Sequence, residues 1–85
     1  MQFIAEITIM PLRDLLDPQG KAISLSLKNL HLSQIEEVRM GKHIHLRLQA
    51  DSAEQAHEIV ENACKQLLVN PIMEQYSFSL KAETA

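Results

Sequence analysis

The sequence is poor in residues that commonly mark covalent cross-links, linkers and charged binding surfaces. The 85 residues include no tryptophan, one cysteine, two glycines and three prolines, and the net charge is −3. One cysteine cannot build an intramolecular disulfide framework, and an acidic chain lacks the basic field that nucleic-acid binding requires. No apolar run approaches the roughly 20 residues needed to span a bilayer. We therefore expect a single cytoplasmic domain over residues 1–85, with no nucleic-acid or membrane partner.

Hydrophobic residues make up 46% of the chain and recur with clear periods. Residues 2–10, 36–50 and about 72–81 alternate between apolar and polar side chains, which predicts strands. Helical spacing runs from 18 to about 30 and again from 53 to 68. This order is typical of an α+β ferredoxin-like sandwich, an antiparallel-containing sheet with two helices on one face.

The segment 36–50 allows two interpretations. Its apolar parity does not change at Gly41, and a two-residue hairpin there would place Met40 opposite His43 on one face. The pattern therefore indicates either a hairpin with an odd-numbered loop or one long strand bent at Gly41, and it favours the long strand. Such a strand would project beyond its own sheet, so we expect a second copy to cover its edge in a homodimer or higher homo-oligomer.

The Gly20-Lys21 pair raises the question of a phosphate-binding loop. A P-loop needs a glycine five residues earlier, where Leu15 stands, and a serine or threonine next, where Ala22 stands. Asp17, followed by a proline, instead has the residue types of an N-cap and first helical position. The stretch is interpreted as a helix start.

The second predicted helix also has clear boundaries. Asp51 and Ser52 are its candidate caps, and an Asn-Pro pair beginning at Asn70 ends it. Its apolar stripe includes Cys64 and Leu67. A free cysteine in such a stripe is typical of core packing rather than of a reactive thiolate.

His43 and His45 lie two residues apart in a predicted strand and so share a face. Two imidazoles can begin a zinc site, which needs three or four ligands. The third would have to be His57, His31 or a carboxylate, and a solvated polar face explains the pair more simply. The remaining carboxylates cap helices or line a solvated helix face, so we expect no catalytic, cofactor or metal site in this chain.

Four short stretches match one family in the right order: "LDPQGKA" (16–22), "VRMGKHI" (38–44), "ADSAEQA" (50–56) and "NPIMEQY" (70–76). On these the sequence resembles PurS, the small subunit of phosphoribosylformylglycinamidine synthase. Two positions depart from the family pattern. His31 stands where a glycine usually ends the first helix, and His45 stands where an acidic residue is common.

The resemblance implies a subunit without activity of its own in a ligase of purine biosynthesis. A large synthetase subunit would use ATP and Mg, a glutaminase subunit would release ammonia from glutamine, and a dimer of the small subunit would bridge them. The candidates for the partner interface are Asp17, Gly20, Lys21, Arg39, Gly41 and Lys42. The alternatives are a free-standing ferredoxin-like ligand-sensing or regulatory dimer and, resting on the two histidines, a small metal-dependent enzyme.

Overall fold

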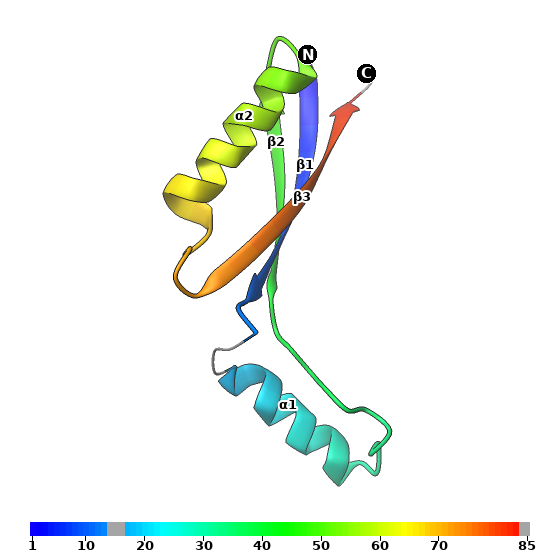
Figure 1. Cartoon of the computed structure of the whole chain (residues 1–85). Coiled ribbons are helices and arrows are strands. Elements are labelled where there is room, and N and C mark those ends of the chain that lie inside the picture. The colour runs from blue at the N-terminus through cyan, green and yellow to red at the C-terminus, as the bar shows by residue number, and fades with distance from the viewer. Residues whose placement is uncertain (14–16, 84–85) are drawn as a thin grey trace.

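The computed structural model describes residues 1–13 and 17–83. Its elements are β1 (Gln2–Pro11), α1 (Pro18–Asn29), β2 (Lys42–Gln49), α2 (Ala53–Ala63), a five-residue π-helical turn η1 (Cys64–Leu68) and β3 (Glu74–Glu83), as Figure 1 shows. The predicted α+β class and the order of the elements are confirmed. Neither α1 nor α2 has the length and apolar character of a membrane-crossing helix, in the part of the chain that the structure describes.

The sheet has three antiparallel strands in the order β2-β1-β3. Ile7, in the central strand, lies opposite Ile44 on one side and Phe78 on the other. Because side chains alternate between the faces of a strand, this register places the apolar positions of all three strands on one face. The central strand provides the deepest part of the core.

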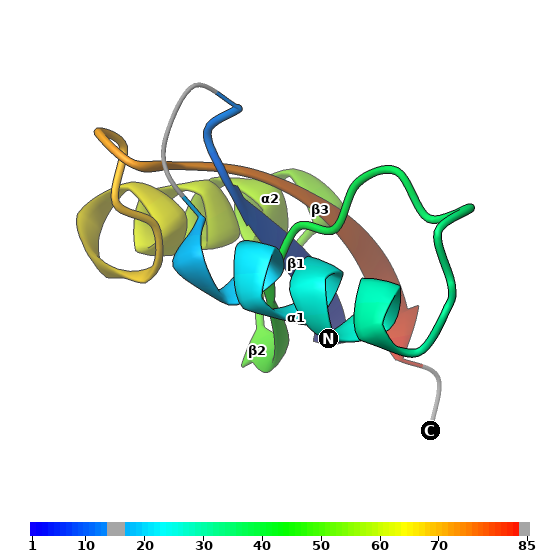
Figure 2. The ribbon, with the colours of Figure 1, turned by 90° about the horizontal axis from the view of Figure 1, so that it is seen from below.

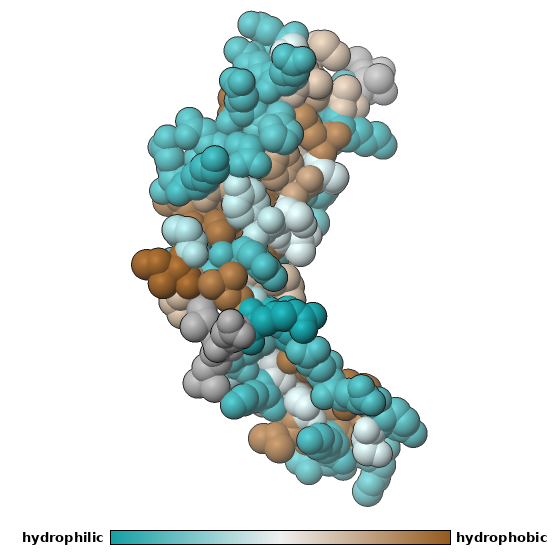
Figure 3. All heavy atoms as spheres, viewed as in Figure 1, coloured by the Kyte–Doolittle hydropathy of each residue, from teal (hydrophilic) through white to brown (hydrophobic). Residues whose placement is uncertain are grey.

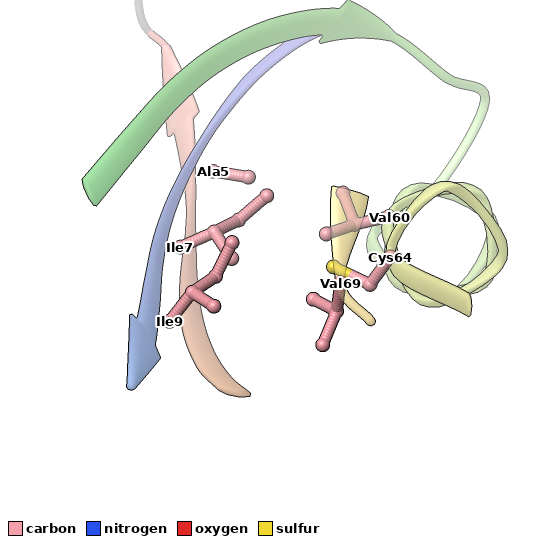
Figure 4. Close-up of a cluster of buried hydrophobic side chains, with 6 residues drawn as sticks. All are labelled: Ala5, Ile7, Ile9, Val60, Cys64 and Val69. Carbon is pink, nitrogen blue, oxygen red and sulfur yellow. The ribbon is translucent and has the colours of Figure 1, made fainter. Parts of the chain in front are cut away.

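Helix α2 covers this apolar face, packing mainly over β1 and β3. In Figure 4 side chains from α2, its π-helical end and the following residue point toward the sheet. The cluster consists of Ala5, Ile7, Ile9, Val60, Cys64 and Val69. Burial raises the pKa of the Cys64 thiol, so the cysteine remains protonated in the core, as its position in the apolar stripe predicts.

Both helices begin with the predicted caps. The Gly20 N–H donates to Asp17 Oδ1 at 3.0 Å, and the Gln55 N–H donates to Ser52 Oγ at 3.1 Å. A proline occupies the first turn of α1, where its missing N–H costs no helical hydrogen bond. Asp51 lies outside the helix, where its N–H donates to the Gln55 side chain at 2.6 Å.

The first helix ends in a Schellman motif without a glycine. The Leu32 N–H donates to the Leu27 carbonyl and the His31 N–H donates to the Lys28 carbonyl, both at 3.0 Å. This pairing requires a left-handed residue at the turn, and His31 has φ 63°. A glycine would adopt this left-handed conformation without the strain that the His31 side chain causes.

The second helix ends just before Asn70, as the Asn-Pro pair predicts, but its last turn is not α-helical. The Val69 N–H donates to the Cys64 carbonyl at 3.1 Å, five residues back, so the last turn is π-helical. This wider turn rotates Leu67 away from the stripe that α-helical spacing predicts, and its side chain is 83% exposed. Val69 takes the buried position instead.

The predicted long strand over 36–50 is wrong, as is the alternative of a hairpin at Gly41. Only residues 42–49 form a strand, and 35–41 run without regular structure. The register explains this difference. The pairing of β1 with β2 stops with Ile9 opposite Lys42, and β1 itself ends two residues later at Pro11. Among the residues that the structure describes, no strand therefore continues beside residues 36–39.

The expectation of two helices on one face of the sheet also fails within this chain. Helix α1 extends beyond the end of the sheet (Figure 1), and the view from below shows it in front of the strand ends, with the returning segment at its side (Figure 2). We call residues 17–41 the arm. The longest dimension of the chain is 51 Å and its radius of gyration is 16.7 Å, whereas a compact domain of this length has about 12 Å.

Candidate functional site at the base of the arm

The base of the arm joins segments that are far apart in the sequence. The start of α1, at Asp17 and Gly20, lies beside the segment that returns to β2. The returning segment adjoins the last residues of β1. The six residues predicted as partner contacts all belong to these two segments. Their surroundings therefore decide what they can do.

Asp17 connects the two segments of the arm. Its Oδ1 accepts the Gly20 N–H at 3.0 Å, which caps α1, and its Oδ2 accepts the Met40 N–H at 2.9 Å. These two hydrogen bonds, the one from Met40 first, lower the pKa of the carboxyl, and the charge of Arg39 acts in the same direction. One ionised side chain thus holds the start of the helix against the returning chain.

Gly20 and Gly41 allow the close approach of backbones at this junction. A Cβ on Gly20 would lie 2.5 Å from the Val38 carbonyl oxygen and would also meet the Asp17 carboxylate. A Cβ on Gly41 would meet the Ile9 carbonyl oxygen. Neither glycine has positive φ, so the requirement is for space rather than for backbone conformation.

The cationic candidates divide into two kinds. Arg39 donates from its guanidinium to the Pro11 carbonyl at the end of β1. Lys42 forms an ion pair with Glu74, with 2.9 Å between Nζ and Oε2. The Lys21 side chain is exposed on α1. Within residues 1–13 and 17–83, Lys21 forms no side-chain hydrogen bond or ion pair, whereas Arg39 and Lys42 do.

Glu74 is a functional residue that sequence reasoning did not single out. Its carboxylate accepts the Asn70 N–H at 2.9 Å in addition to pairing with Lys42, and these contacts, the Asn70 hydrogen bond first, lower its pKa. The available signal was the stretch 70–76, which contains it. Three of the four short motifs described in the sequence, at 16–22, 38–44 and 70–76, are thus joined by contacts at the base of the arm.

The phosphate-binding interpretation of Gly20-Lys21 fails on the geometry. The Gly20 N–H, which a phosphate would need, already donates to Asp17. An anion would also have to displace or approach the ionised Asp17 carboxylate, which is unfavourable. The pair belongs to the helix start and to the junction.

The two histidines lie on the face of the sheet opposite α2. Both contact the same carboxylate: His43 Nε2 pairs with Glu6 Oε2, and His45 Nδ1 lies 2.6 Å from Glu6 Oε1. His57 lies elsewhere, with its ring 5.0 Å from that of Phe78. Within residues 1–13 and 17–83, no three histidine, cysteine or acidic side chains are grouped to hold a metal ion.

The arm has a stripe of apolar side chains at its surface. Ile23, Leu27 and Leu30 follow one another at helical spacing, and the side chains of Ile23 and Leu30 are 37% and 66% exposed. Figure 3 shows apolar side chains reaching the surface along the arm and where the arm meets the sheet. Exposed apolar patches of this kind usually mark an interaction surface.

The comparisons with known proteins decide the family. A family model described as "PurS: Phosphoribosylformylglycinamidine (FGAM) synthase" matches residues 4–82. The chain belongs to the PurS family. The Thermotoga maritima phosphoribosylformylglycinamidine synthase subunit PurS is 43% identical over 60 residues, which cover 71% of this chain and 73% of that protein.

Solved PurS structures have the same fold. The Thermotoga maritima PurS subunit superposes with a TM-score of 0.88 at 34% identity, covering 95% of this chain and 93% of the other. A chain of the Thermotoga maritima PurLQS structure also gives a TM-score of 0.88 at 34% identity, covering 95% and 99%. The ferredoxin-like fold expected for the family is therefore confirmed, and so is membership of the FGAM synthase subunit family of purine biosynthesis.

Proposed function

We propose that this chain is the non-catalytic subunit that bridges the synthetase and glutaminase subunits of FGAM synthase and supports ammonia transfer between them. The observation that supports this most strongly is its likeness, over nearly its whole length, to a chain of the PurLQS structure. ATP, Mg and glutamine are used by the partner subunits, and the complex works in the cytoplasm. The comparisons do not favour the alternative of a free-standing sensor.

We also propose that the chain forms a homodimer through the arm. The exposed stripe of α1 supports this proposal, because a helix of 12 residues gains most of its stability from packing an apolar face rather than from helix propensity. Among the described residues, α1 has the returning segment beside it and makes no substantial contact with the sheet or α2. A second copy would supply the missing partner surface.

The elongated shape supports the same proposal. At 16.7 Å the radius of gyration exceeds the roughly 12 Å of a compact 85-residue domain. Helix α2 packs mainly over β1 and β3, and the apolar side chains Ile44 and Leu46 of β2 are only half-buried. The arm of a second copy would fit over this strip beside β2, giving each sheet the two helices on one face that the family fold predicts.

In this proposal the residues at the base of the arm act mainly by fixing its direction. Asp17 and Gly20 hold the two segments of the arm together. Arg39 and Gly41 join the arm to the end of β1, and Lys42 joins β2 to β3. Lys21 is the member that contacts a partner subunit directly. Replacing Lys21 with alanine should therefore leave folding almost unchanged and weaken only partner binding, which a pull-down with the large subunit measures.

Reconstitution tests the bridging function. The purified chain alone should have no glutaminase, ATPase or ligase activity. Adding it to its synthetase and glutaminase partners should raise glutamine-dependent FGAM formation, whereas formation from added ammonia should depend on it much less. Steady ATP hydrolysis by this chain alone, or full glutamine-dependent activity without it, would contradict the proposal.

Sedimentation tests the dimer with a matched pair of variants. Leu30 and Leu25 are 66% and 64% exposed, but Leu25 lies on the opposite side of α1 from the stripe. Leu30→Ser should weaken dimer formation at micromolar concentration, and Leu25→Ser should have little effect. A monomeric wild-type chain with a concentration-independent melting temperature would contradict the homodimer proposal. The bridging proposal would not be affected by that result.

A further inference from the structure

Strand β2 is held to the rest of the molecule in an unusual way. Within the described residues it is an edge strand whose backbone pairs only with β1, and α2 packs mainly over the other two strands. At its first residue, Lys42, it continues directly into the arm. Its attachment therefore helps to fix the arm, together with the contacts of Arg39 and Gly41 at the end of β1.

Every cationic or imidazole side chain of β2 contacts a carboxylate on another strand. Lys42 pairs with Glu74 and Arg47 pairs with Glu83, both at 2.9 Å. These two glutamates belong to β3, so the pairs cross the central strand near each end of β2. Between them, His43 and His45 share the carboxylate of Glu6 on β1.

We propose that these pairs form a charge-dependent clasp, so that β2 and the arm detach from the sheet before β1 separates from β3. Backbone pairing connects β2 to the sheet along one edge only, and the side-chain pairs add to it at both ends and in the middle. The β1–β3 pairing has the buried side chains beneath α2 to support it. Loss of charge on these side chains should therefore weaken the pairing of β2 with β1 before it weakens the pairing of β1 with β3.

The direction of the pH effect follows from Glu6. Hydrogen bonds from His43, then His45, lower the pKa of Glu6, so its contribution is present above the ordinary carboxyl pKa and is lost as the pH falls through the lowered value. The clasp should therefore be firm near neutral pH and should loosen in acid as the Glu6 carboxylate becomes protonated.

The other groups on this face do not reverse the effect. On β3 the residue opposite Glu6 is the uncharged Ser79. Arg47 and Lys81 lie opposite Ile4, two residues before Glu6 on the same face, and both are cationic. Glu83 is already paired with Arg47.

Hydrogen exchange measured by mass spectrometry tests the clasp, on the whole chain in its native oligomeric state at fixed concentration. After correction for intrinsic exchange, Glu6→Gln should lower protection of β2 peptides about two- to fivefold near pH 6, because two exposed pairs are lost. Peptides of β3 should change little. The matched control is Glu58→Gln, at an exposed position of α2, which should leave β2 unchanged.

Salt and a second variant separate the clasp from a general loss of stability. About 1 M NaCl, where the Debye length is about 3 Å, should reduce β2 protection in the wild type and add little to Glu6→Gln. His45→Gln should reproduce part of the effect, because it removes one of the two contacts to Glu6. If β2 and β3 lose protection together, or if Glu6→Gln leaves β2 as protected as the wild type, the clasp is overturned.

Discussion

Gly20→Ala gives the sharpest test of the junction, because helix propensity and structure predict opposite signs. Replacing glycine by alanine inside a helix usually stabilises by up to about 1 kcal/mol. Here the new Cβ would lie 2.5 Å from the Val38 carbonyl oxygen and would meet the Asp17 carboxylate. Overpacking of this kind costs roughly 1–3 kcal/mol, so we expect a net destabilisation of about 1–2 kcal/mol.

Chemical and thermal unfolding at fixed protein concentration would measure this change. For a domain of this size each kcal/mol shifts the melting temperature by about 4–8 °C. Ser26→Ala is the matched control, since it adds helix propensity at an exposed position of α1 without a close neighbour, and it should be neutral or slightly stabilising. A Gly20→Ala variant that melts higher than the wild type would refute the close packing of the arm on its returning segment.

Three further predictions concern individual turns and contacts. Asp17→Ala should lower the melting temperature by about 5 °C at neutral pH. The folded pKa of Asp17 lies below its ordinary value of 3.8, so the difference in melting temperature between wild type and variant should shrink as acid protonates the wild-type carboxyl. His31→Gly should stabilise by about 1 kcal/mol in urea unfolding, because it removes the left-handed strain, whereas His31→Ala should not. Leu67→Ala should lower the free energy of unfolding by at most about 0.5 kcal/mol, as expected at an exposed position, whereas Ile7→Ala should lower it by roughly 2–5 kcal/mol. Equal losses of stability in the two variants would contradict the π-helical turn.

The sequence predicted the elements that local rules control. Alternation identified β1 and β3. The cap at Asp17 located the start of α1 to the residue, and the candidate caps Asp51 and Ser52 located the start of α2 to within one residue. These signals involve residues within a few positions of each other, so no knowledge of the tertiary structure is needed. The core positions of β1 followed from the same alternation.

The errors occurred where a distant partner decides the structure. Residues 36–41 alternate like a strand, yet alternation cannot reveal whether another strand lies alongside, and β1 ends before it could. Leu67 has α-helical spacing, but the Val69 hydrogen bond to Cys64 makes the last turn wider. The position of the arm depends on contacts outside α1, which periodicity does not report.

The candidate site was predicted in part. Motif matching selected six residues that the structure brings to one region, but it could not distinguish residues that join the arm to the sheet from a residue that faces outward. That distinction rests on the Met40 N–H, the Pro11 carbonyl and Glu74, whose roles depend on tertiary contacts. The sequence alone does not predict the clasp on β2 for the same reason, because each of its pairs joins residues more than 30 positions apart.

The central place of β1 in the sheet has a consequence for biosynthesis. β1 is made first, yet one of its neighbours is β3, about 70 residues later in the chain, where Ile7 pairs with Phe78. Until those residues leave the ribosome, the apolar strand β1 has one edge without a backbone partner. Unpaired strand edges of this kind readily pair with other chains. Contacts this distant in sequence also slow folding. The nascent chain should therefore depend on chaperones or rapid completion more than its small size would suggest.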